Sequence, residues 1–311
     1  MTLTLFRPPL QTALRGRAAP VSPVLLSPRI SARMPKSLER VSTQQDRSHT
    51  TSSHAPQSPV SSSVSSAEVN HFSQLASTWW DPHGPSRLLH LMNPLRHDFI
   101  KACLRSSESP PPQTLSYLDI GCGGGIFASS AARLSNTSTV TAIDPTELVI
   151  QVAQAQQRSD PSISPPKLKY LKCAIEDVPV PQSEFEKVDI ITLFEVLEHI
   201  DNPNQFLHLA TPHLKKGGWI VGSTISRSPL AYVTTKLIAE APLIGIVPAG
   251  THDWNKYINP EQLLRYFSMQ EPSLWGDFKT QGVIYVPVLG WKLVKNSETF
   301  GNYFFGIQKL T

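Results

Sequence analysis

The chain has 311 residues, enough for one large domain or two small ones. Apolar residues make up 40% of it and charged residues 17%, which suits a packed globular core. The net charge of +4 is uneven: residues 1–66 hold eight basic and two acidic residues and carry +6, which leaves −2 for the rest. The basic charge thus belongs to the N-terminal segment, and we expect no nucleic-acid partner.

Residues 1–47 have the composition of a mitochondrial transit peptide. No acid precedes Pro35, and five arginines are spread among Leu, Ala, Ser and Thr. A disordered tail without a targeting role is the alternative. We expect a polar, disordered linker over residues 48–67 and one globular domain over 68–311. The sequence contains no run of about 18 apolar, uncharged residues that would cross a membrane as a helix.

The apolar pattern of the globular part predicts helices first and then alternating strands and helices. Residues 69–103 are expected to be helical, with a turn at Asp81–Gly84. The later alternation implies an α/β fold, a mostly parallel sheet with helices on both faces. The last two strands lack a helix between them, which predicts a terminal hairpin with one antiparallel strand. Strands are expected at 116–120, 139–143, 168–173, 188–193, 219–224, 282–288 and 303–308, and helices at 126–134, 147–157 and 204–214.

A glycine-rich turn follows the first predicted strand. From Asp119 to Gly125 it reads D-x-G-x-G-x-G, a pattern typical of class I methyltransferases. Glycines let the backbone approach a ligand closely, and ligands of open α/β sheets bind at the carboxyl ends of strands. A dinucleotide fingerprint needs glycine where Ile126 stands, which disfavours a nicotinamide oxidoreductase. The carboxylate of Asp119 suits a cationic sulfonium ligand with an amino group, so we predict S-adenosyl-L-methionine as the cofactor.

Two further acids follow the next two predicted strands. Asp144 ends the second strand, where an acid can accept both ribose hydroxyls of an adenosine. Asp177 follows the third strand and is a candidate to accept from the adenine amino group, with a solvated loop acid as an equal alternative. Three acids after three successive strands fit one nucleoside better than they fit chance.

A second group of polar residues follows the fourth predicted strand. If a helical turn begins there, Glu195, Glu198 and His199 stand at i, i+3 and i+4 and share a face. Two carboxylates and an imidazole could bind a divalent cation, and mostly oxygen ligands favour Mg²⁺ or Mn²⁺ over zinc. The alternative is structural, because acids are favourable in a first helical turn for reasons of the helix dipole alone.

Together these residues resemble the ubiquinone-biosynthesis O-methyltransferase family, over Phe72 to about Leu310. The shared motifs are Phe72 with Trp79-Trp80-Asp81, Asn93-Pro94-Leu95-Arg96, Asp119–Gly125, Glu195–His199, Gly250-Thr251-His252-Asp253-Trp254, Lys256 and Asn259-Pro260.

The resemblance implies a class I methyltransferase fold, a Rossmann-like sheet of seven strands with the last one antiparallel. It also implies a divalent cation held by Glu195, Glu198 and His199. The cofactor contacts that it implies, together with those assigned from the turn and the acids, are Arg96, Asp119, Gly121, Gly123, Asp144, Asp177 and Phe194.

The family's substrates are catechols with a polyprenyl tail. The resemblance therefore implies methyl transfer to a catechol hydroxyl of a polyprenyl dihydroxybenzoate and of demethylubiquinol, with a cation such as Mg²⁺ lowering the hydroxyl's pKa. His199 when unliganded, or His252, would accept the proton. The resemblance also implies a peripheral position on the matrix side of the mitochondrial inner membrane, in a multi-enzyme ubiquinone-synthesis complex.

The segment 229–250 interrupts the predicted alternation of strands and helices. Its apolar residues recur at helical spacing and continue into an apolar stretch between Pro242 and Pro248. Two interpretations fit: an element lying on a bilayer, or a lid packed on the substrate pocket. The resemblance favours the first.

Two rival functions are open to the chain as a whole. One is a methyltransferase for another lipid-like small molecule. The other is a non-catalytic assembly subunit that keeps the fold to hold partners. An intact Asp119–Gly125 turn with Asp144 and Glu195 argues against the second, since a scaffold need not keep a cofactor pocket.

Overall fold

A computed structural model describes residues 63–232, 253–270 and 273–311, all within one compact unit, Ser58–Thr311. The predicted transit peptide (1–47), most of the predicted linker and the larger part of the 229–250 insert lie outside the described residues, as does His252. Among the described residues, no helix is long and apolar enough to cross a membrane.

The described chain starts by attaching to the domain. Ser63 donates a backbone hydrogen bond to Glu176 Oε1 at 2.7 Å, and Val64 forms a β-bridge with Ile200. Helix α1 (Ser66–Leu75) then begins, because the Ser65 hydroxyl accepts from the backbone N–H of Glu68 at 3.3 Å. The first helix thus starts inside the stretch expected to be linker.

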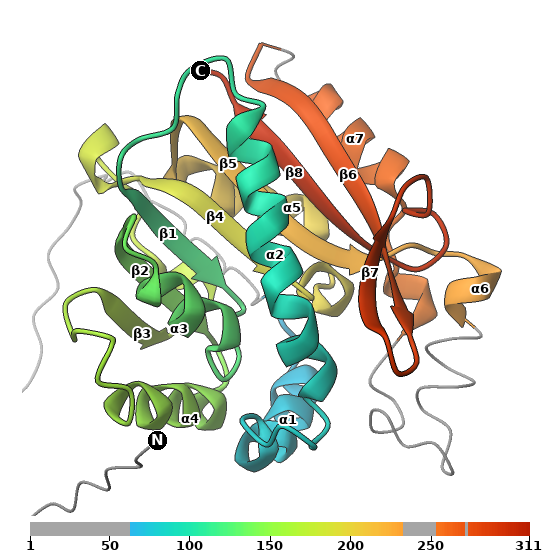
Figure 1. Ribbon diagram of the computed structural model, residues 1–311. Coiled ribbons are helices and arrows are strands. Elements are labelled where there is room, and N and C mark those ends of the chain that lie inside the picture. Colours follow the sequence, from blue (N-terminus) through green and yellow to red (C-terminus); the bar gives the residue numbers. More distant parts are fainter. Residues whose placement is uncertain (1–62, 233–252, 271–272) are drawn as a thin grey trace, which may run out of the picture. The chain divides into compact units, whose positions relative to one another are not determined.

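The sheet has eight strands in the described residues, in the order β3-β2-β1-β4-β5-β8-β6-β7 (Figure 1). Strands β1 to β5 are parallel, and β8 runs antiparallel to both β5 and β6. The predicted α/β class and the antiparallel last strand are therefore confirmed. The strands are β1 (Leu115–Ile120), β2 (Thr137–Asp144), β3 (Leu168–Lys172), β4 (Val188–Phe194), β5 (Leu214–Ile225), β6 (Trp275–Val286), β7 (Gly290–Val294) and β8 (Asn302–Lys309).

The expected count of seven strands is wrong, because β7 is an additional strand. The first half of β6 pairs with β8, as at Phe278↔Ile307, and its second half pairs with β7, as at Val283↔Leu293. The terminal hairpin is therefore formed by β6 and β7 and not by the last two predicted strands. No residue of β7 is buried, so the strand lacks the core-facing pattern on which the prediction relied.

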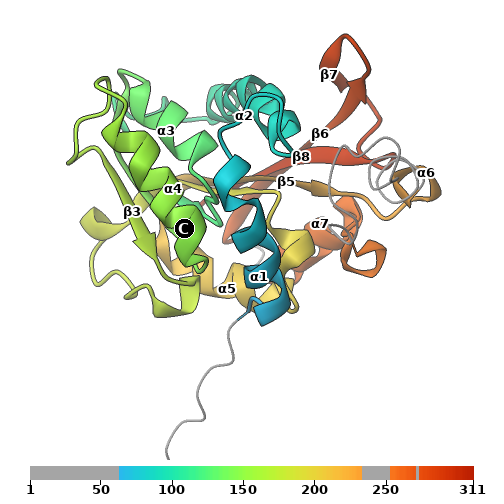
Figure 2. The ribbon, with the colours of Figure 1, turned by 90° about the horizontal axis from the view of Figure 1, so that it is seen from below.

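Helices cover both faces of the sheet (Figure 2). Helices α2, α3 and α4 contribute to one core cluster, and α5 and α7 contribute to another on the opposite face. Strand β1 supplies both, because Tyr117 points to the first cluster and Leu118 to the second. The longer helices are α2 (Arg87–Arg105), α3 (Ile126–Arg133), α4 (Glu147–Arg158), α5 (Pro203–Ala210) and α7 (Pro260–Met269). Short helical turns are η1 (Ala76–Thr78), η2 (Ile175–Asp177), η3 (Glu184–Glu186), η4 (Leu197–His199), η5 (Thr211–His213), α6 (Pro229–Tyr232) and η7 (Trp254–Lys256).

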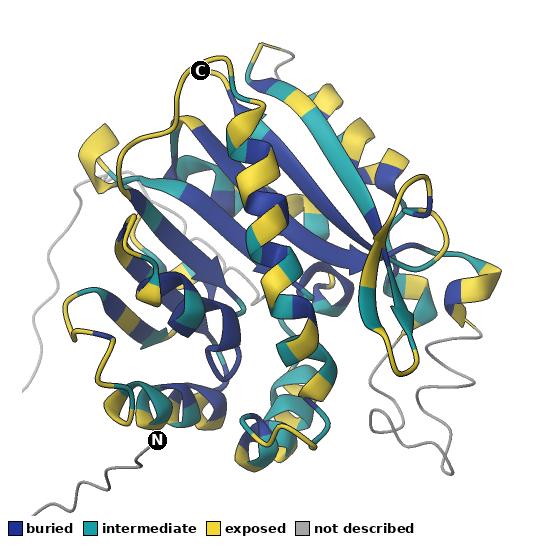
Figure 3. Cartoon of the chain, viewed as in Figure 1, coloured by how far each residue is buried: buried dark blue, intermediate teal, exposed yellow. Residues whose placement is uncertain are grey.

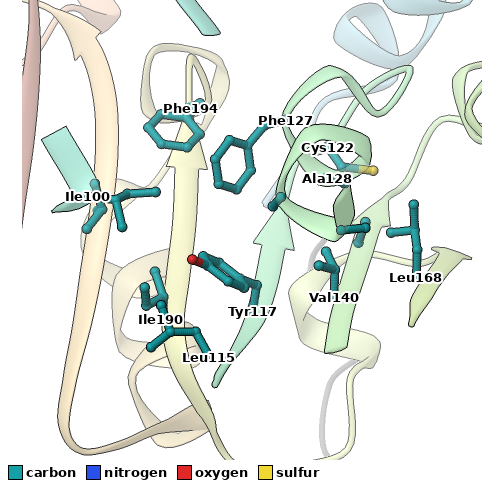
Figure 4. Close-up of a cluster of buried hydrophobic side chains, with 14 of the residues drawn as sticks. Ile100, Leu115, Tyr117, Cys122, Phe127, Ala128, Val140, Leu168, Ile190 and Phe194 are labelled. Carbon is teal, nitrogen blue, oxygen red and sulfur yellow. The ribbon is translucent and has the colours of Figure 1, made fainter. Parts of the chain in front are cut away.

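The central strands are buried along most of their length, whereas the outer faces of the helices are exposed (Figure 3). In the first core cluster the ring of Phe127 contacts Phe194 at a centroid distance of 4.8 Å and Tyr117 at 6.1 Å (Figure 4). Phe194 ends β4, so this aromatic packing fixes the place where the chain leaves the sheet toward Glu195.

Gly222 in β5 offers a test of the packing between β4, β5 and β8. A Cβ there would lie 2.4 Å from Phe305 Cζ and 2.6 Å from the carbonyl oxygen of Leu193. We expect Gly222→Ala to lower the free energy of unfolding by about 2 kcal/mol, as overpacking does. Gly301→Ala is the matched control, because a Cβ at Gly301 would meet no atom within 4 Å. Urea unfolding of both variants checks the difference, and equal stabilities would contradict this packing.

Candidate functional site

A cavity of about 530 Å³ opens where β1, β2 and β4 end. It collects nearly all the described residues that the sequence analysis selected. These are Arg96, Asp119, Gly121, Gly123, Asp144, Phe194, Glu195, Glu198 and His199. Asp177 is not among the lining residues, since its carboxylate caps its own helical turn by accepting from the backbone N–H of Ala174 at 3.3 Å.

The glycine turn is bound to the end of the neighbouring strand. The backbone N–H groups of Gly121 and Cys122 both donate to the carbonyl of Ile143, at 2.9 and 3.0 Å. Asp144 completes the attachment: one carboxylate oxygen accepts from Gly123 N–H at 3.0 Å and the other from Thr146 N–H at 2.8 Å. Each oxygen keeps a lone pair, so Asp144 can hold the turn and still accept from a ligand in the cavity.

Glycine is required in this turn for two separate reasons. Gly121, Gly123 and Gly125 have φ of +70°, +50° and +84°, which L side chains rarely adopt. In addition, the indole of Trp79 covers the turn, so a Cβ on Gly123 or on Gly124 would lie 2.3 Å from a ring carbon. The sequence analysis noted Trp79 only as part of a motif, since no spacing rule links it to a turn more than forty residues away.

Buried charge concentrates beside the turn. Arg96 is 4% exposed, its guanidinium lies 4.8 Å from the centre of the Phe194 ring, and its Nε is buried with no partner in the described part of the chain. Asp119 accepts from the Thr192 hydroxyl at 2.7 Å through one oxygen, while the other is buried and unpartnered there. Burial raises the pKa of Asp119 to about 7, against the opposing effects of Thr192 and Arg96.

Glu195 takes a conformation that the sequence did not indicate. Its φ is +58°, in the left-handed region, and its backbone N–H donates to the carbonyl of Ser223 at 3.1 Å. The helical turn after it, η4, covers only Leu197–His199, so the expected helical face shared by Glu195, Glu198 and His199 is wrong. Non-glycine residues in this region are strained, and such strain concentrates at functional sites.

The other two members of the predicted trio have partners of their own. Glu198 is 4% exposed and accepts from the Thr224 hydroxyl at 2.9 Å, and burial together with the charge of Glu195 raises the pKa of Glu198. His199 Nδ1 donates to Glu68 on α1 at 3.0 Å. Burial alone would lower the pKa of His199, but the hydrogen bond with Glu68 and the charges of Glu198 and Glu68 raise it above its ordinary value.

The pairing of Glu68 with His199 joins residues 131 positions apart, and no sequence pattern indicated it. Ser65 followed three residues later by Glu68 has the form of a capping box, in which the acid would return to the start of its own helix. In the structure only half of that motif forms, and the carboxylate of Glu68 instead reaches His199 and approaches Lys256 Nζ at 3.9 Å.

The predicted metal trio does not fit a cation as it stands. Glu195, Glu198 and His199 line one cavity, but within residues 63–232, 253–270 and 273–311 no three His, Cys, Asp or Glu side chains converge to hold a metal ion. Glu198 accepts from Thr224 through Oε2, and His199 donates to Glu68 through Nδ1.

Comparison with known proteins defines the class. Residues 88–274 match a family model described as a methyltransferase domain. A plantazolicin methyltransferase solved in complex with SAH and a desmethyl substrate analogue shares the fold at a TM-score of 0.52 and 16% identity, covering 79% of this chain and 97% of that one. A possible histamine N-methyltransferase from Thermotoga maritima has a TM-score of 0.50 and 16% identity, over 77% and 99%. The chain has the class I methyltransferase fold.

Closer relatives give the family. A protein of Candida albicans named ubiquinone biosynthesis O-methyltransferase, mitochondrial, is 37% identical over 80% of this chain and 86% of its own length. The protein of that name from Schizosaccharomyces pombe is 40% identical, over 79% and 87%. A bacterial relative from Hydrogenovibrio crunogenus is 38% identical, over 63% and 76%. This chain belongs to the ubiquinone biosynthesis O-methyltransferase family and is an S-adenosylmethionine-dependent O-methyltransferase.

The raised pKa of Asp119 predicts how stability depends on pH. The folded protein binds a proton at Asp119 that the unfolded chain releases near pH 4, so stability is lost as pH rises from about 4 to about 7. Asp119→Asn removes this loss and keeps the acceptor for Thr192. The variant should therefore gain stability relative to wild type across that range, by up to about 1.4 kcal/mol per pH unit. Unfolding of the cofactor-free protein in urea at several pH values measures it.

The exposed Asp277 on β6 supplies the control. Asp277→Asn should track the wild-type pH dependence. If the stability of Asp119→Asn followed the same pH dependence as wild type, the inference that the pKa of Asp119 is raised would be wrong.

Proposed function

We propose that the chain transfers the methyl group of S-adenosylmethionine to a catechol hydroxyl of a polyprenyl dihydroxybenzoate and of demethylubiquinol. The observation that carries this proposal is that one cavity joins two unlike ends. Its polar end holds Arg96, Asp119 and Asp144 beside the glycine turn, and its other end is walled by apolar side chains. A sulfonium cofactor suits the first end, and an aromatic acceptor with an isoprenoid tail suits the second.

The polar end offers a partner for each group of the cofactor. The guanidinium of Arg96 is buried beside the cavity with an Nε that has no partner among the described residues, which suits the carboxylate of the methionine moiety. The Asp119 oxygen that is unpartnered in the same part of the chain suits the amino group. The remaining lone pairs of Asp144 suit the ribose hydroxyls. Asp177 is left out of this assignment because it does not line the cavity.

The apolar end is built from three separate parts of the chain. The cavity walls there include Leu230 on α6, Tyr285 and Trp291 of the β6–β7 hairpin, and Phe300 before β8. Because both ends belong to one cavity, an aromatic ring held among these residues can present a hydroxyl toward the sulfonium. The protein then contributes chiefly alignment for an in-line transfer.

Proton transfer is assigned to the acids that follow β4. The hydrogen bond with Glu68 and the charges of Glu198 and Glu68 raise the pKa of His199 and so favour its charged form, and a charged imidazole can stabilise a phenolate but cannot take up its proton. Glu198 lines the same cavity and has a raised pKa, which brings a carboxylate closer to the range of an effective base. We therefore propose Glu198 in place of His199 as the acceptor. His252 lies outside the described residues.

The divalent cation implied by the resemblance enters only as a separate proposal. His199 bonds Glu68 through Nδ1 and Glu198 bonds Thr224 through Oε2, so binding a cation through the other imidazole nitrogen and the other carboxylate oxygen need not break either bond. The Oε1 atom of Glu195 is buried and has no hydrogen-bond partner among the described residues. When bound, such a cation would lower the pKa of the catechol hydroxyl.

The proposal includes a mitochondrial location. The fungal and mammalian relatives are named mitochondrial, and the acid-poor segment 1–47 has the composition of a transit peptide. Peripheral attachment to the matrix side of the inner membrane and membership of a multi-enzyme complex are part of the same proposal. Within the 229–250 insert, only α6 (Pro229–Tyr232) lies in the described residues.

A methyl-transfer assay tests the acceptor. We expect turnover with a short-tailed dihydroxybenzoate and with a short-tailed demethylubiquinol, measured by product mass, and none with acceptors that lack a catechol. The same assay with a chelator tests whether a divalent cation takes part. Loss of turnover that Mg²⁺ restores would support the proposed cation, and full turnover with the chelator would contradict it. Cofactor binding without catechol methylation would point to another lipid-like acceptor.

Asp144 tests the cofactor end. Asp144→Ala removes an acceptor for the ribose and releases the turn at Gly123, so affinity for S-adenosylmethionine should fall at least about tenfold. Asp177→Ala is the matched control, since Asp177 also follows a strand but does not line the cavity, and its affinity should equal that of wild type. Calorimetric titration measures both. A comparable loss in Asp177→Ala would restore the adenine contact predicted from the sequence.

A further inference from the structure

The hairpin between β6 and β7 exposes apolar side chains at its tip. Val288 is 101% exposed and Leu289 is 65% exposed. On the strand that follows, Leu293 and Val294 are exposed as well. The hairpin projects from the rest of the sheet, of which β7 is the last strand (Figure 2). A run of exposed apolar residues at a projecting tip marks a contact surface rather than an ordinary turn.

The backbone at the tip makes this apolar choice unfavourable by itself. Val288 has φ of +71°, a conformation that favours glycine or asparagine and that β-branched residues rarely adopt. Turns of exposed hairpins usually carry Gly, Asn or Asp. An apolar, β-branched residue at this position is therefore unfavourable both for its exposure to water and for its backbone conformation. This indicates that Val288 serves a contact outside the folded chain.

The same hairpin forms part of the wall of the cavity. Tyr285, Pro287 and Trp291 all line it, on either side of the exposed tip. The hairpin is held in place by a hydrogen bond from Trp291 Nε1 to the carbonyl of Leu88 on α2, at 2.9 Å, and by ring contact between Trp291 and Tyr285. The apolar tip is thus fixed within a few residues of the apolar end of the cavity.

The charges around the tip have one sign. From Tyr285 to Asn296 the chain contains no acid, and its charged residues are Lys292 and Lys295, both exposed. Apolar side chains flanked by lysines suit the interface of a bilayer that contains anionic lipids, where the apolar groups enter the acyl boundary and the ammonium groups stay at the headgroups.

We propose that the β6–β7 hairpin is a membrane-contacting element that inserts Val288 and Leu289 into an anionic lipid surface and sets the apolar end of the cavity against it. The proposal deepens the proposed function, because a polyprenyl acceptor would then reach the cavity directly from the bilayer. A lipid surface is favoured over a protein partner because so small a turn covers little of the roughly 1,000 Å² that specific protein interfaces bury.

Flotation of the full chain with vesicles tests the proposal, and it does not depend on methyl transfer. Vesicles of phosphatidylcholine and phosphatidylglycerol in equal parts are compared with vesicles of phosphatidylcholine alone. We expect the wild type to float with the anionic vesicles. We expect V288E/L289E to bind these vesicles at least about tenfold more weakly than the wild type. K292E/K295E should bind the anionic vesicles more weakly than the wild type, and this difference should shrink as the salt concentration rises.

Two controls separate insertion from misfolding. Phe185 is 99% exposed on η3 and does not line the cavity, so Phe185→Glu should float like wild type. Val288→Asn suits the left-handed backbone, so it should unfold at an equal or higher urea concentration while still binding vesicles more weakly. Both tip variants should methylate a short-tailed soluble catechol at the wild-type rate, since Val288 and Leu289 lie outside the cavity lining.

Wild-type flotation by V288E/L289E, or no flotation by the wild type, would overturn the proposal. Loss of self-association in the tip variants without any vesicle binding would assign the hairpin to a second copy of the chain and would overturn it too. Normal flotation with no catechol turnover would leave the hairpin's role intact and refute the proposed acceptor instead.

Discussion

The attachment of the glycine turn to the end of β2 is the constraint on which the site depends. Two N–H groups converge on the carbonyl of Ile143, and Asp144, the next residue, holds Gly123. The ends of β1 and β2 are therefore joined by the backbone that a ligand must approach. This attachment goes with a left-handed backbone at three glycines of the turn. Because the glycines have no side chains, the indole of Trp79 can lie directly on the turn. A ligand that uses Asp144 engages the group that shapes its own binding surface.

The residues around the turn lower the stability of the fold and leave hydrogen-bonding groups available to a ligand. Asp119, Glu198 and Arg96 are all buried next to one cavity, and burial of a charge is costly unless the charge is paired. Their arrangement leaves hydrogen-bonding capacity open, as the unpartnered Nε of Arg96 and the free oxygen of Asp119 show among the described residues. A zwitterionic ligand with a carboxylate and an amino group would satisfy both. The left-handed backbone of Glu195 also costs stability, because a strained conformation persists only where the surrounding structure holds it in place.

Much of this architecture could be predicted from the sequence, for physical reasons that can be named. Strands β1 and β4 and most of β5 are buried, so their apolar runs stand out, and a chain that alternates such runs with helices forms a parallel sheet. The residues after those strands meet at one edge, which is why Asp119, Asp144 and Glu195 were found together. Strand β7 was missed because it buries no residue and has no core-facing pattern.

Side-chain partners across long separations could not be predicted in the same way. No rule based on the sequence linked Glu68 to His199, and Glu195, expected in a helical turn, instead takes a left-handed conformation with its N–H bonded to Ser223. Trp79 is another instance, because the turn that it covers lies far along the chain. The adenine contact predicted for Asp177 from its position after β3 stays a prediction, and its carboxylate also accepts from the backbone of its own turn, a local bond that the sequence did not indicate.

The attachments at the start of the described chain set a limit on maturation. Ser63, Val64 and Glu68 are joined to Glu176, Ile200 and His199, and the last of these lies in the cavity wall. If residues 1–47 are removed as a transit peptide, as their composition predicts, cleavage within that segment would leave all three attachments in place. Cleavage after Val64 would remove the bonds to Glu176 and Ile200 and leave the bond between Glu68 and His199 as the remaining one of the three.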